Sequence, residues 1–179
     1  GLVRITGGQE ITGFTPVTDP AVLQRLAESA RPHILQCDLK AQGISDFGQF
    51  ASRGFGLPEA AAPLELFFND EPMTIARWPN DDYTTIAATP AGQTEPDLRG
   101  IEVPHGKDGF HYHGDRPAAW QSDNDIWMHG FWTWNWAESY VRIQNIDIPN
   151  RLIQTAEPHG CYGYKARQRY YFLNILEEL

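Results

Sequence analysis

The chain has 179 residues, of which 41% are hydrophobic and 12% aromatic, so it can bury a core and is too apolar to be disordered. Its formal net charge is −9 and it has no basic run, which disfavours nucleic acid and anionic membranes as partners. The negative charge favours a neutral or cationic ligand. No apolar segment approaches the roughly 20 residues needed to cross a bilayer.

The N-terminal third predicts one helix, a strand and a long loop. Asp19 and Pro20 are typical of a helix start, with Asp19 as the N-cap, and the following spacing of leucines predicts a helix over residues 19–30. Apolar residues then alternate over residues 33–39, which predicts a strand. Residues 41–62 are rich in Gly, Ala and Ser, which predicts a surface loop.

Residues 64–78 predict a β-hairpin, because apolar residues alternate on both sides of the Asn-Asp-Glu-Pro turn at 69–72. Asn and Asp tolerate the left-handed backbone that such turns need. The acidic pair at 81–82 lacks the spacing of a calcium loop and is interpreted as a solvated turn. Residues 83–88 predict a short strand, and 89–100 a polar loop.

His111 and His113 would share one face of a strand, which is a common way to present two imidazoles to a metal. A third ligand would have to come from His105, Asp115 or His129 through folding. The alternative is that these histidines form hydrogen bonds at an exposed strand end, and no metal or other cofactor is predicted.

Cys37 and Cys161 are the two cysteines of the chain, and they have no CxxC spacing. A disulfide between them and two separate thiols both fit, so the redox compartment does not follow. His33 would share a strand face with Cys37, either as a metal pair or, on the alternative interpretation, at the edge of the core.

Tryptophans repeat at every second position in residues 132–136, and this alternation predicts a strand that presents three indoles on one face. The apolar phase then moves to Val141 and Ile143, and afterwards to Ile146 and Ile148. Each shift predicts a bulge or a corner, because a slip of one residue sends a side chain to the opposite face.

The tryptophan row has two interpretations: an aromatic wall of the core, or a platform on which sugar rings stack. In the second, polar side chains at the rim would contact the sugar. The candidate residues are Trp127, His129, Trp132, Trp134, Asn135, Trp136 and Glu138.

A glycosidase would need two carboxyl groups, about 5–5.5 Å apart for retention or about 6.5–9.5 Å apart for inversion. The acidic candidates are Asp123, Asp125, Glu138 and Asp147, and of these Asp125 and Glu138 are kept as catalytic candidates. Each is equally plausible as a solvated charge. A metal-dependent oxidative enzyme that uses His111 and His113 is a further alternative.

Four stretches together resemble a known family: 64–80, 114–120, 125–137 and 162–179. Within them stand LELFFN, PMTIARWPN, GDRP, DIWMHGFWTWNWA, YGY and LNILEEL. They resemble the N-terminal part of bacterial right-handed parallel β-helix proteins of the glycoside-hydrolase type, in which a β-sandwich-like domain interrupts the helix after its first rungs. That group includes xylosidase-like, xylanase-like, fucosidase-like and uncharacterised proteins.

The chain departs from that group because it shows no repeating rungs. We therefore expect an inserted β domain excised from a larger β-helix protein, with residues 1–14 and 173–179 as possible edges of missing rungs. The resemblance places the catalytic carboxylates beyond Leu179. It adds Asp115 and Arg116 to the carbohydrate-binding candidates, as residues that shape the domain or border the substrate cleft. It implies a secreted or periplasmic location and two partners, a polysaccharide and the remainder of the β-helix.

The sequence thus predicts an all-β, sandwich- or barrel-like single domain over residues 1–179, with one short N-terminal helix and a possible C-terminal helical turn. Three functions stay open. The first is a carbohydrate-associated, non-catalytic domain that positions polysaccharide. The second is an enzyme in its own right, and the third is a structural module that braces a β-helix.

Overall fold

The structure is a computed structural model that describes residues 7–61, 63–90, 94–96, 99–104, 106–121 and 125–179. Its internal contacts divide the chain into two compact units, Gly1–Phe47 and Gly48–Leu179. The single domain predicted over residues 1–179 spans both of these units, which are described separately below.

Short strands dominate the chain, and the all-β prediction is confirmed. In chain order the elements are β1 (Thr15–Pro16), α1 (Pro20–Arg25), η1 (Arg31–His33), β2 (Leu35–Gln36), η2 (Lys40–Gln42), β3 (Arg53–Gly54), β4 (Phe67–Phe68), β5 (Glu71–Pro72), β6 (Arg77–Trp78), β7 (Thr84–Ala88), β8 (Thr94–Pro96), β9 (Glu102–Pro104), η3 (Gly106–Asp108), β10 (Phe110–Tyr112), η4 (Arg116–Ala119), β11 (Trp127–Phe131), β12 (Glu138–Asp147), β13 (Leu152–Thr155), β14 (Arg169–Leu173) and η5 (Leu176–Glu178). The η elements are short 3₁₀ turns, and none of the helices in the described residues is both long and apolar enough to span a membrane.

The first unit holds the predicted helix, but the helix is shorter than predicted. Asp19 caps it by accepting a hydrogen bond from the Ala21 amide at 2.8 Å, and Pro20 opens it, as predicted. The predicted end at residue 30 is wrong. Leu26 leaves the helical backbone after Arg25 and is itself buried, and the helix therefore ends five residues before the predicted end.

The strand predicted over residues 33–39 shrinks to β2, which pairs antiparallel with β1. His33 belongs to a 3₁₀ turn before β2, and another 3₁₀ turn begins at Lys40 after it. The alternation of apolar residues in the sequence is therefore longer than the strand that pairs. The two-residue partner strand limits the length of β2, because an extended segment is stable only where a neighbour satisfies its backbone. Both Cys37 and Cys161 are free thiols.

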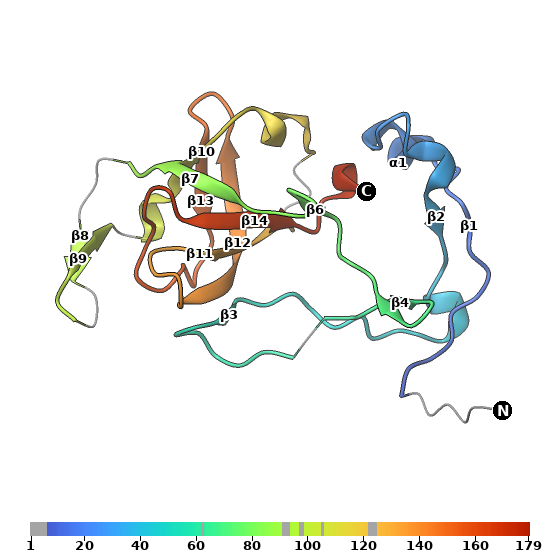
Figure 1. Cartoon of the computed structure of the whole chain (residues 1–179). Coiled ribbons are helices and arrows are strands. Elements are labelled where there is room, and N and C mark those ends of the chain that lie inside the picture. Colours follow the sequence, from blue (N-terminus) through green and yellow to red (C-terminus); the bar gives the residue numbers. More distant parts are fainter. Residues whose placement is uncertain (1–6, 62, 91–93, 97–98, 105, 122–124) are drawn as a thin grey trace. The chain divides into compact units, whose positions relative to one another are not determined.

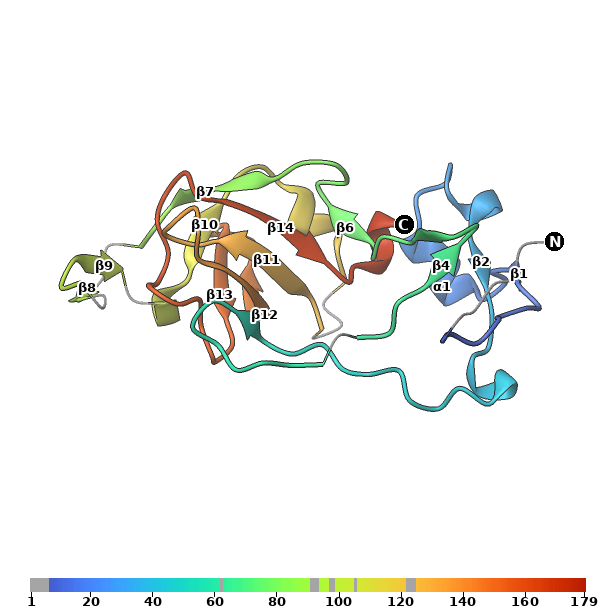
Figure 2. The same cartoon turned by 60° about the horizontal axis from the view of Figure 1, so that its bottom comes forward.

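The second unit is built around a closed barrel of six antiparallel strands in the order β11–β12–β13–β10–β7–β14, with β14 returning to β11 (Figure 1). The short strand β3 adds to β12, and β6 adds to β14. Figure 2 shows β11, β14 and β6 side by side in the turned view. Closure leaves few unpaired strand edges, which stabilises a barrel built of short strands.

Strand β12 forms a corner of the barrel. Its first half pairs with β11, its second half pairs with β13, and the register shifts between Ile143 and Asn145. This confirms the bulge predicted from the change in apolar phase between Ile143 and Ile146. A bulge increases the local twist, and the strand can therefore pass from one neighbour to the next.

The core lies inside the barrel and is largely aromatic. Side chains alternate, so that Met128 on β11, Val141 on β12 and Phe172 on β14 point inward and are fully buried. The other buried members of this cluster are Ile86, Phe110, Tyr112, Trp120, Ile126, Trp132, Ile143, Ile153, Tyr164, Tyr170 and Ile175. Every one of them belongs to the second unit.

The strand predicted through the tryptophan run is wrong. Strand β11 ends at Phe131, and residues 132–137 form a turn that the Ala137 amide closes by donating to the Trp134 carbonyl at 3.1 Å. Trp132 turns inward and is only 1% exposed. Its indole rests on two glycines, since a Cβ at Gly130 or Gly160 would lie 2.8 or 2.6 Å from its ring.

Backbone partners from another segment explain this turn. The Trp132 carbonyl accepts from the Lys165 amide at 2.9 Å, and the Thr133 carbonyl accepts from the Gln168 side chain at 2.6 Å. The Thr133 hydroxyl donates to the carbonyls of Tyr162 and Gly163. Bonds to a loop thus replace the strand pairing that the alternation predicts.

Other predictions in this unit are mostly confirmed. A hairpin is present, and Asn69 and Asp70 at its turn both have positive φ, but its strands β4 and β5 are only two residues long. The predicted return strand over 73–78 is wrong, because its only strand residues form β6, which pairs with β14. The strand over residues 83–88 is β7, and the C-terminal helical turn is η5. The loop over 89–100 is only partly a loop, because β8 pairs with β9, and β3 lies inside the predicted loop 41–62.

Candidate functional site

A row of side chains in contact crosses the outer face of the barrel from β3 to β6. His129 on β11 lies opposite Tyr140 on β12 and Tyr171 on β14, with ring centroids 4.5 and 5.1 Å away. An arginine covers each end, with Arg53 lying 3.8 Å from the Tyr140 ring and Arg77 3.6 Å from the Tyr171 ring. We call these five residues the outer row.

Strand register produces this row directly. In β11, β12 and β14 the residues that alternate with the buried core positions must face outward, and the pairing brings His129, Tyr140 and Tyr171 level with one another. The two added strands extend the same line by pairing Arg53 with Tyr140 and by ending the other side at Arg77.

Glu138 joins the outer row through His129. One carboxylate oxygen of Glu138 lies 2.9 Å from His129 Nε2, and the Glu138 side chain is 41% exposed while that of His129 is 12% exposed. Burial lowers the pKa of His129 below its ordinary value. The hydrogen bond to Glu138 opposes this shift, and the nearby charges of Arg53 and Arg77 add to it.

A second line of residues runs beside the outer row. Phe131 pairs with Glu138 across the β11–β12 hairpin, and the Arg169 guanidinium lies 4.0 Å from the Phe131 ring and 5.5 Å from the Tyr83 ring. Tyr83 in turn lies 5.5 Å from Tyr171 of the outer row. Aromatic and cationic groups therefore cover a continuous part of this face.

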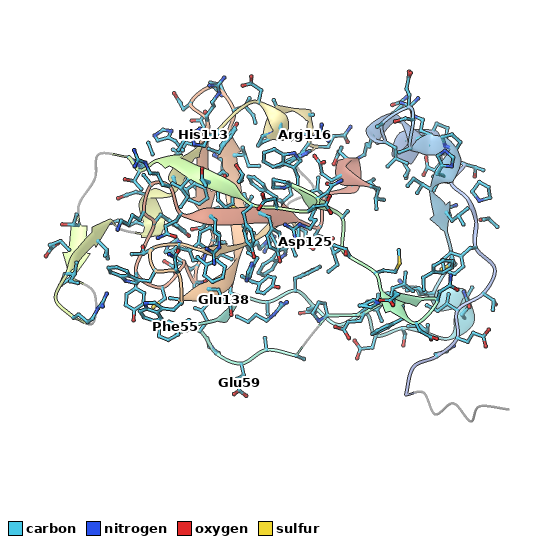
Figure 3. The ribbon with its side chains drawn as sticks, in the orientation of Figure 1. Phe55, Glu59, His113, Arg116, Asp125 and Glu138 are labelled. Carbon is cyan, nitrogen blue, oxygen red and sulfur yellow. The ribbon has the colours of Figure 1, made fainter. Side chains whose placement is uncertain are left out.

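Two exposed aromatic side chains and a half-buried one meet next to Glu138. The centroid of Phe55 lies 4.9 Å from that of Trp136 and 5.9 Å from that of Tyr162, and Trp136 is 53% exposed. The Phe55 amide donates to the Glu138 carbonyl at 2.8 Å, and Figure 3 shows the two side chains close together. We call Phe55, Trp136 and Tyr162 the aromatic cluster.

The predicted catalytic pair is not brought together. Asp125 precedes β11, whereas Glu138 pairs with Phe131 at the far end of that strand, and Figure 3 shows them well apart. The Asp125 carboxylate instead accepts from Trp127 Nε1 at 2.8 Å and from the Asn174 side chain at 3.1 Å. Four strand steps from Trp127 to Phe131 span about 13 Å, beyond the separation that glycoside hydrolysis uses.

The predicted carbohydrate-binding tryptophans separate into different environments. Trp127 is 5% exposed and stacks against Phe50 at 5.8 Å, and Trp132 belongs to the core. Trp134 is partly buried beneath the Arg99 guanidinium at 4.4 Å. Of the tryptophan row, Trp136 is exposed, and the neighbouring Asn135 is exposed with it.

Asp115 and Arg116 form two ion pairs with other parts of the barrel unit. Asp115 accepts from Arg151 at 2.7 Å on the surface. Arg116 donates two hydrogen bonds of 2.7 Å to the buried carboxylate of Glu178, which also accepts from Trp120 Nε1. The hydrogen bond to Glu178 raises the pKa of Arg116. Arg116 therefore fixes η5 against the segment around Trp120.

The histidine pair does not gather further metal ligands. His111 Nδ1 lies 3.0 Å from the Asn150 carbonyl, and His113 follows β10 as an exposed residue. Within the described part of the chain, no three His, Cys, Asp or Glu side chains are arranged to hold a metal. His105 and Asp123 lie outside the described residues.

The sequence did not reveal the arginines of this face or two members of the aromatic cluster. Arg53, Phe55 and Tyr162 lie in segments without a regular pattern, so only tertiary contacts bring them to Trp136 and Tyr140. A signal was present for Arg169, which alternates with the buried Tyr170 and Phe172 on a strand. The sequence thus predicts which positions of a strand face outward, but not which residues of other strands and loops pack against them.

Comparison with known proteins finds no matching family model, curated protein or solved structure. The functional assignment therefore depends on the geometry of the barrel face.

Proposed function

We propose that the barrel of residues 48–179 is a carbohydrate-binding, non-catalytic domain that positions a polysaccharide. The observation that carries this proposal is the aromatic cluster, in which Trp136 is 53% and Phe55 41% exposed. Apolar rings on a surface offer the faces of sugar rings a contact that excludes water. Buried indoles such as Trp132 offer none.

Polar groups beside the aromatic cluster suit the rest of a sugar. Glu138 accepts hydrogen bonds, and its side chain is 41% exposed, so it can accept from sugar hydroxyls while its contact with His129 holds it in place. Asn135 is exposed next to Trp136 and offers both a donor and an acceptor. Hydrophobic faces with a few polar groups at the rim are typical of sites for such ligands.

Catalysis is not part of the proposal, because Asp125 and Glu138 lie at opposite ends of β11. On the family resemblance given above, the polysaccharide would be processed by a β-helix domain elsewhere in a larger secreted or periplasmic protein. The barrel would then hold the chain while that partner domain acts on it.

The test has two steps. The full chain is first screened for binding to an array of plant and microbial polysaccharides, and its retardation is then measured in native gels that contain the polysaccharides it binds. We expect Trp136→Ala to weaken retardation about tenfold or more, since loss of a stacked ring costs on the order of 1–3 kcal/mol. The midpoint of thermal unfolding should change little, because Trp136 is an exposed turn residue.

The matched control is Phe68→Ala. Phe68 is an aromatic residue that is 65% exposed on β4, outside the aromatic cluster, and its loss should leave retardation unchanged. A folded chain that binds no polysaccharide on the array would contradict the proposal and leave the bracing role.

A further inference from the structure

The outer face of the barrel carries an excess of positive charge that the rest of the chain lacks. The chain as a whole has 14 Lys and Arg against 23 Asp and Glu. The five strands that form this face, β3, β6, β11, β12 and β14, contain four arginines and two acids. One of these acids, Asp147, lies beyond the register shift in β12, where it accepts from Asn150.

Three of these arginines have no acidic partner. Arg53, Arg77 and Arg169 form no ion pair with any described residue, whereas Arg116 and Arg151 each do. Arg77 donates to the backbone carbonyls of Pro79 and Asp82. Arg53 Nη1 is buried with no hydrogen-bond partner among the described residues, and the guanidinium of Arg169 makes no hydrogen bond to them.

Aromatic rings hold these guanidinium groups in fixed positions. Arg53, Arg77 and Arg169 lie 3.8, 3.6 and 4.0 Å from the Tyr140, Tyr171 and Phe131 rings. A guanidinium that stacks through its face keeps its N–H groups at its edge, where they can donate to an anion in a planar, two-pronged arrangement. A carboxylate matches this geometry.

The arginines and the aromatic cluster belong to the same surface. Arg53 and Phe55 lie two residues apart in one segment, and this segment pairs with β12 from Tyr140 to Glu138. Tyr140 supports Arg53, and Glu138 lies between the aromatic cluster and Phe131. A ligand seated on Trp136 would therefore reach the arginine-bearing part of the face through its neighbouring sugar units.

On the basis of the proposed function, we propose that the ligand is an acidic polysaccharide, whose uronic acid carboxylates bind Arg53 and Arg169 while its sugar rings stack on the aromatic cluster. Glu138 accepts hydrogen bonds from sugar hydroxyl groups and repels any carboxylate placed beside it. It therefore selects the orientation of the bound polysaccharide. The net charge of −9 opposes the approach of any polyanion at long range, so the arginines of this face have to attract the carboxylates locally.

The experiment compares two forms of one polymer, polygalacturonate and its fully methyl-esterified derivative, in native gels that contain the intact chain as the migrating protein. Esterification removes the carboxylate charge and keeps the sugar backbone. We expect the acidic polymer to retard the chain about tenfold more strongly than the ester, the size of a charged hydrogen-bond contribution.

The double variant Arg53→Gln and Arg169→Gln should lose the preference for the acidic polymer and be retarded equally by both polymers. Arg169→Lys tests geometry, since lysine keeps the charge but not the planar fork, and it should recover only part of the preference. The matched control is Lys107→Gln, an exposed cation outside this face, which should behave as the wild type. Circular dichroism and the unfolding midpoint establish that each variant is folded.

The outcomes separate the two proposals. Retardation that depends on Trp136 but is equal for acid and ester overturns the acidic-ligand proposal alone. No retardation by either polymer, together with an empty polysaccharide array, overturns both. Retardation by polyuridylate as strong as by polygalacturonate overturns the assignment to a sugar acid, because it would show binding of polyanions in general.

Discussion

His129 in the outer row combines burial with an acidic contact, that with Glu138. Burial lowers the pKa of its imidazole in the folded chain, so the unfolded chain binds this proton first as pH falls. The resulting contribution to stability is complete above the unfolded pKa of about 6.5 and is lost as pH falls from there toward the folded pKa.

We therefore predict that the free energy of unfolding decreases between about pH 7 and pH 5, and that His129→Gln removes part of this decrease. Urea unfolding followed by tryptophan fluorescence at several pH values would measure it. His113→Gln is the control, because His113 is exposed, and this variant should follow the wild-type curve. Parallel curves for wild type and His129→Gln would rule out this role of His129.

At the scale of elements, two glycines with the same left-handed backbone differ in their surroundings. Gly109, just before β10, has φ +71°, and a Cβ there would lie 1.9 Å from the Ile153 carbonyl oxygen on β13. Gly114, after β10, has φ +73°, and nothing lies within 4 Å of its Cβ position. The close approach of β10 to β13 thus requires glycine at 109 alone.

Gly114→Ala should cost about 1–2 kcal/mol, the cost of the left-handed backbone for a residue with a Cβ. Gly109→Ala should cost that amount and the additional displacement of β13, on the order of 3 kcal/mol or more in total. Equilibrium denaturation of both variants measures the difference directly. Equal losses would show that the backbone conformation, rather than the contact with Ile153, sets the requirement.

Elements differ in how far the sequence predicts them. The hairpin at β4 and β5 was predictable because its turn residues, Asn69 and Asp70, choose the left-handed backbone locally. The bulge in β12 was predictable because its apolar phase changes within one strand. The turn after Phe131 was not, since its carbonyls are satisfied by Lys165 and Gln168, more than thirty residues away.

For the whole molecule, the entire aromatic core belongs to the second unit, from Trp78 to Ile175. We predict that the fragment Gly48–Leu179 folds alone and unfolds cooperatively, with a midpoint within about 5 °C of that of the full chain. Calorimetry of both proteins would test this. A fragment that loses its near-ultraviolet circular dichroism would show that residues 1–47 are required to form the barrel.

The sequence by itself determined the class of the fold, the helix cap at Asp19 and the faces of the individual strands, because capping, turn chemistry and alternation act over a few residues. Tertiary structure alone decided which tryptophan is buried and which is exposed. It also gathered Arg53, His129 and Tyr171 from three separate strands into one row. Strand pairing brings together residues distant in the chain, and no local pattern encodes that choice of neighbour.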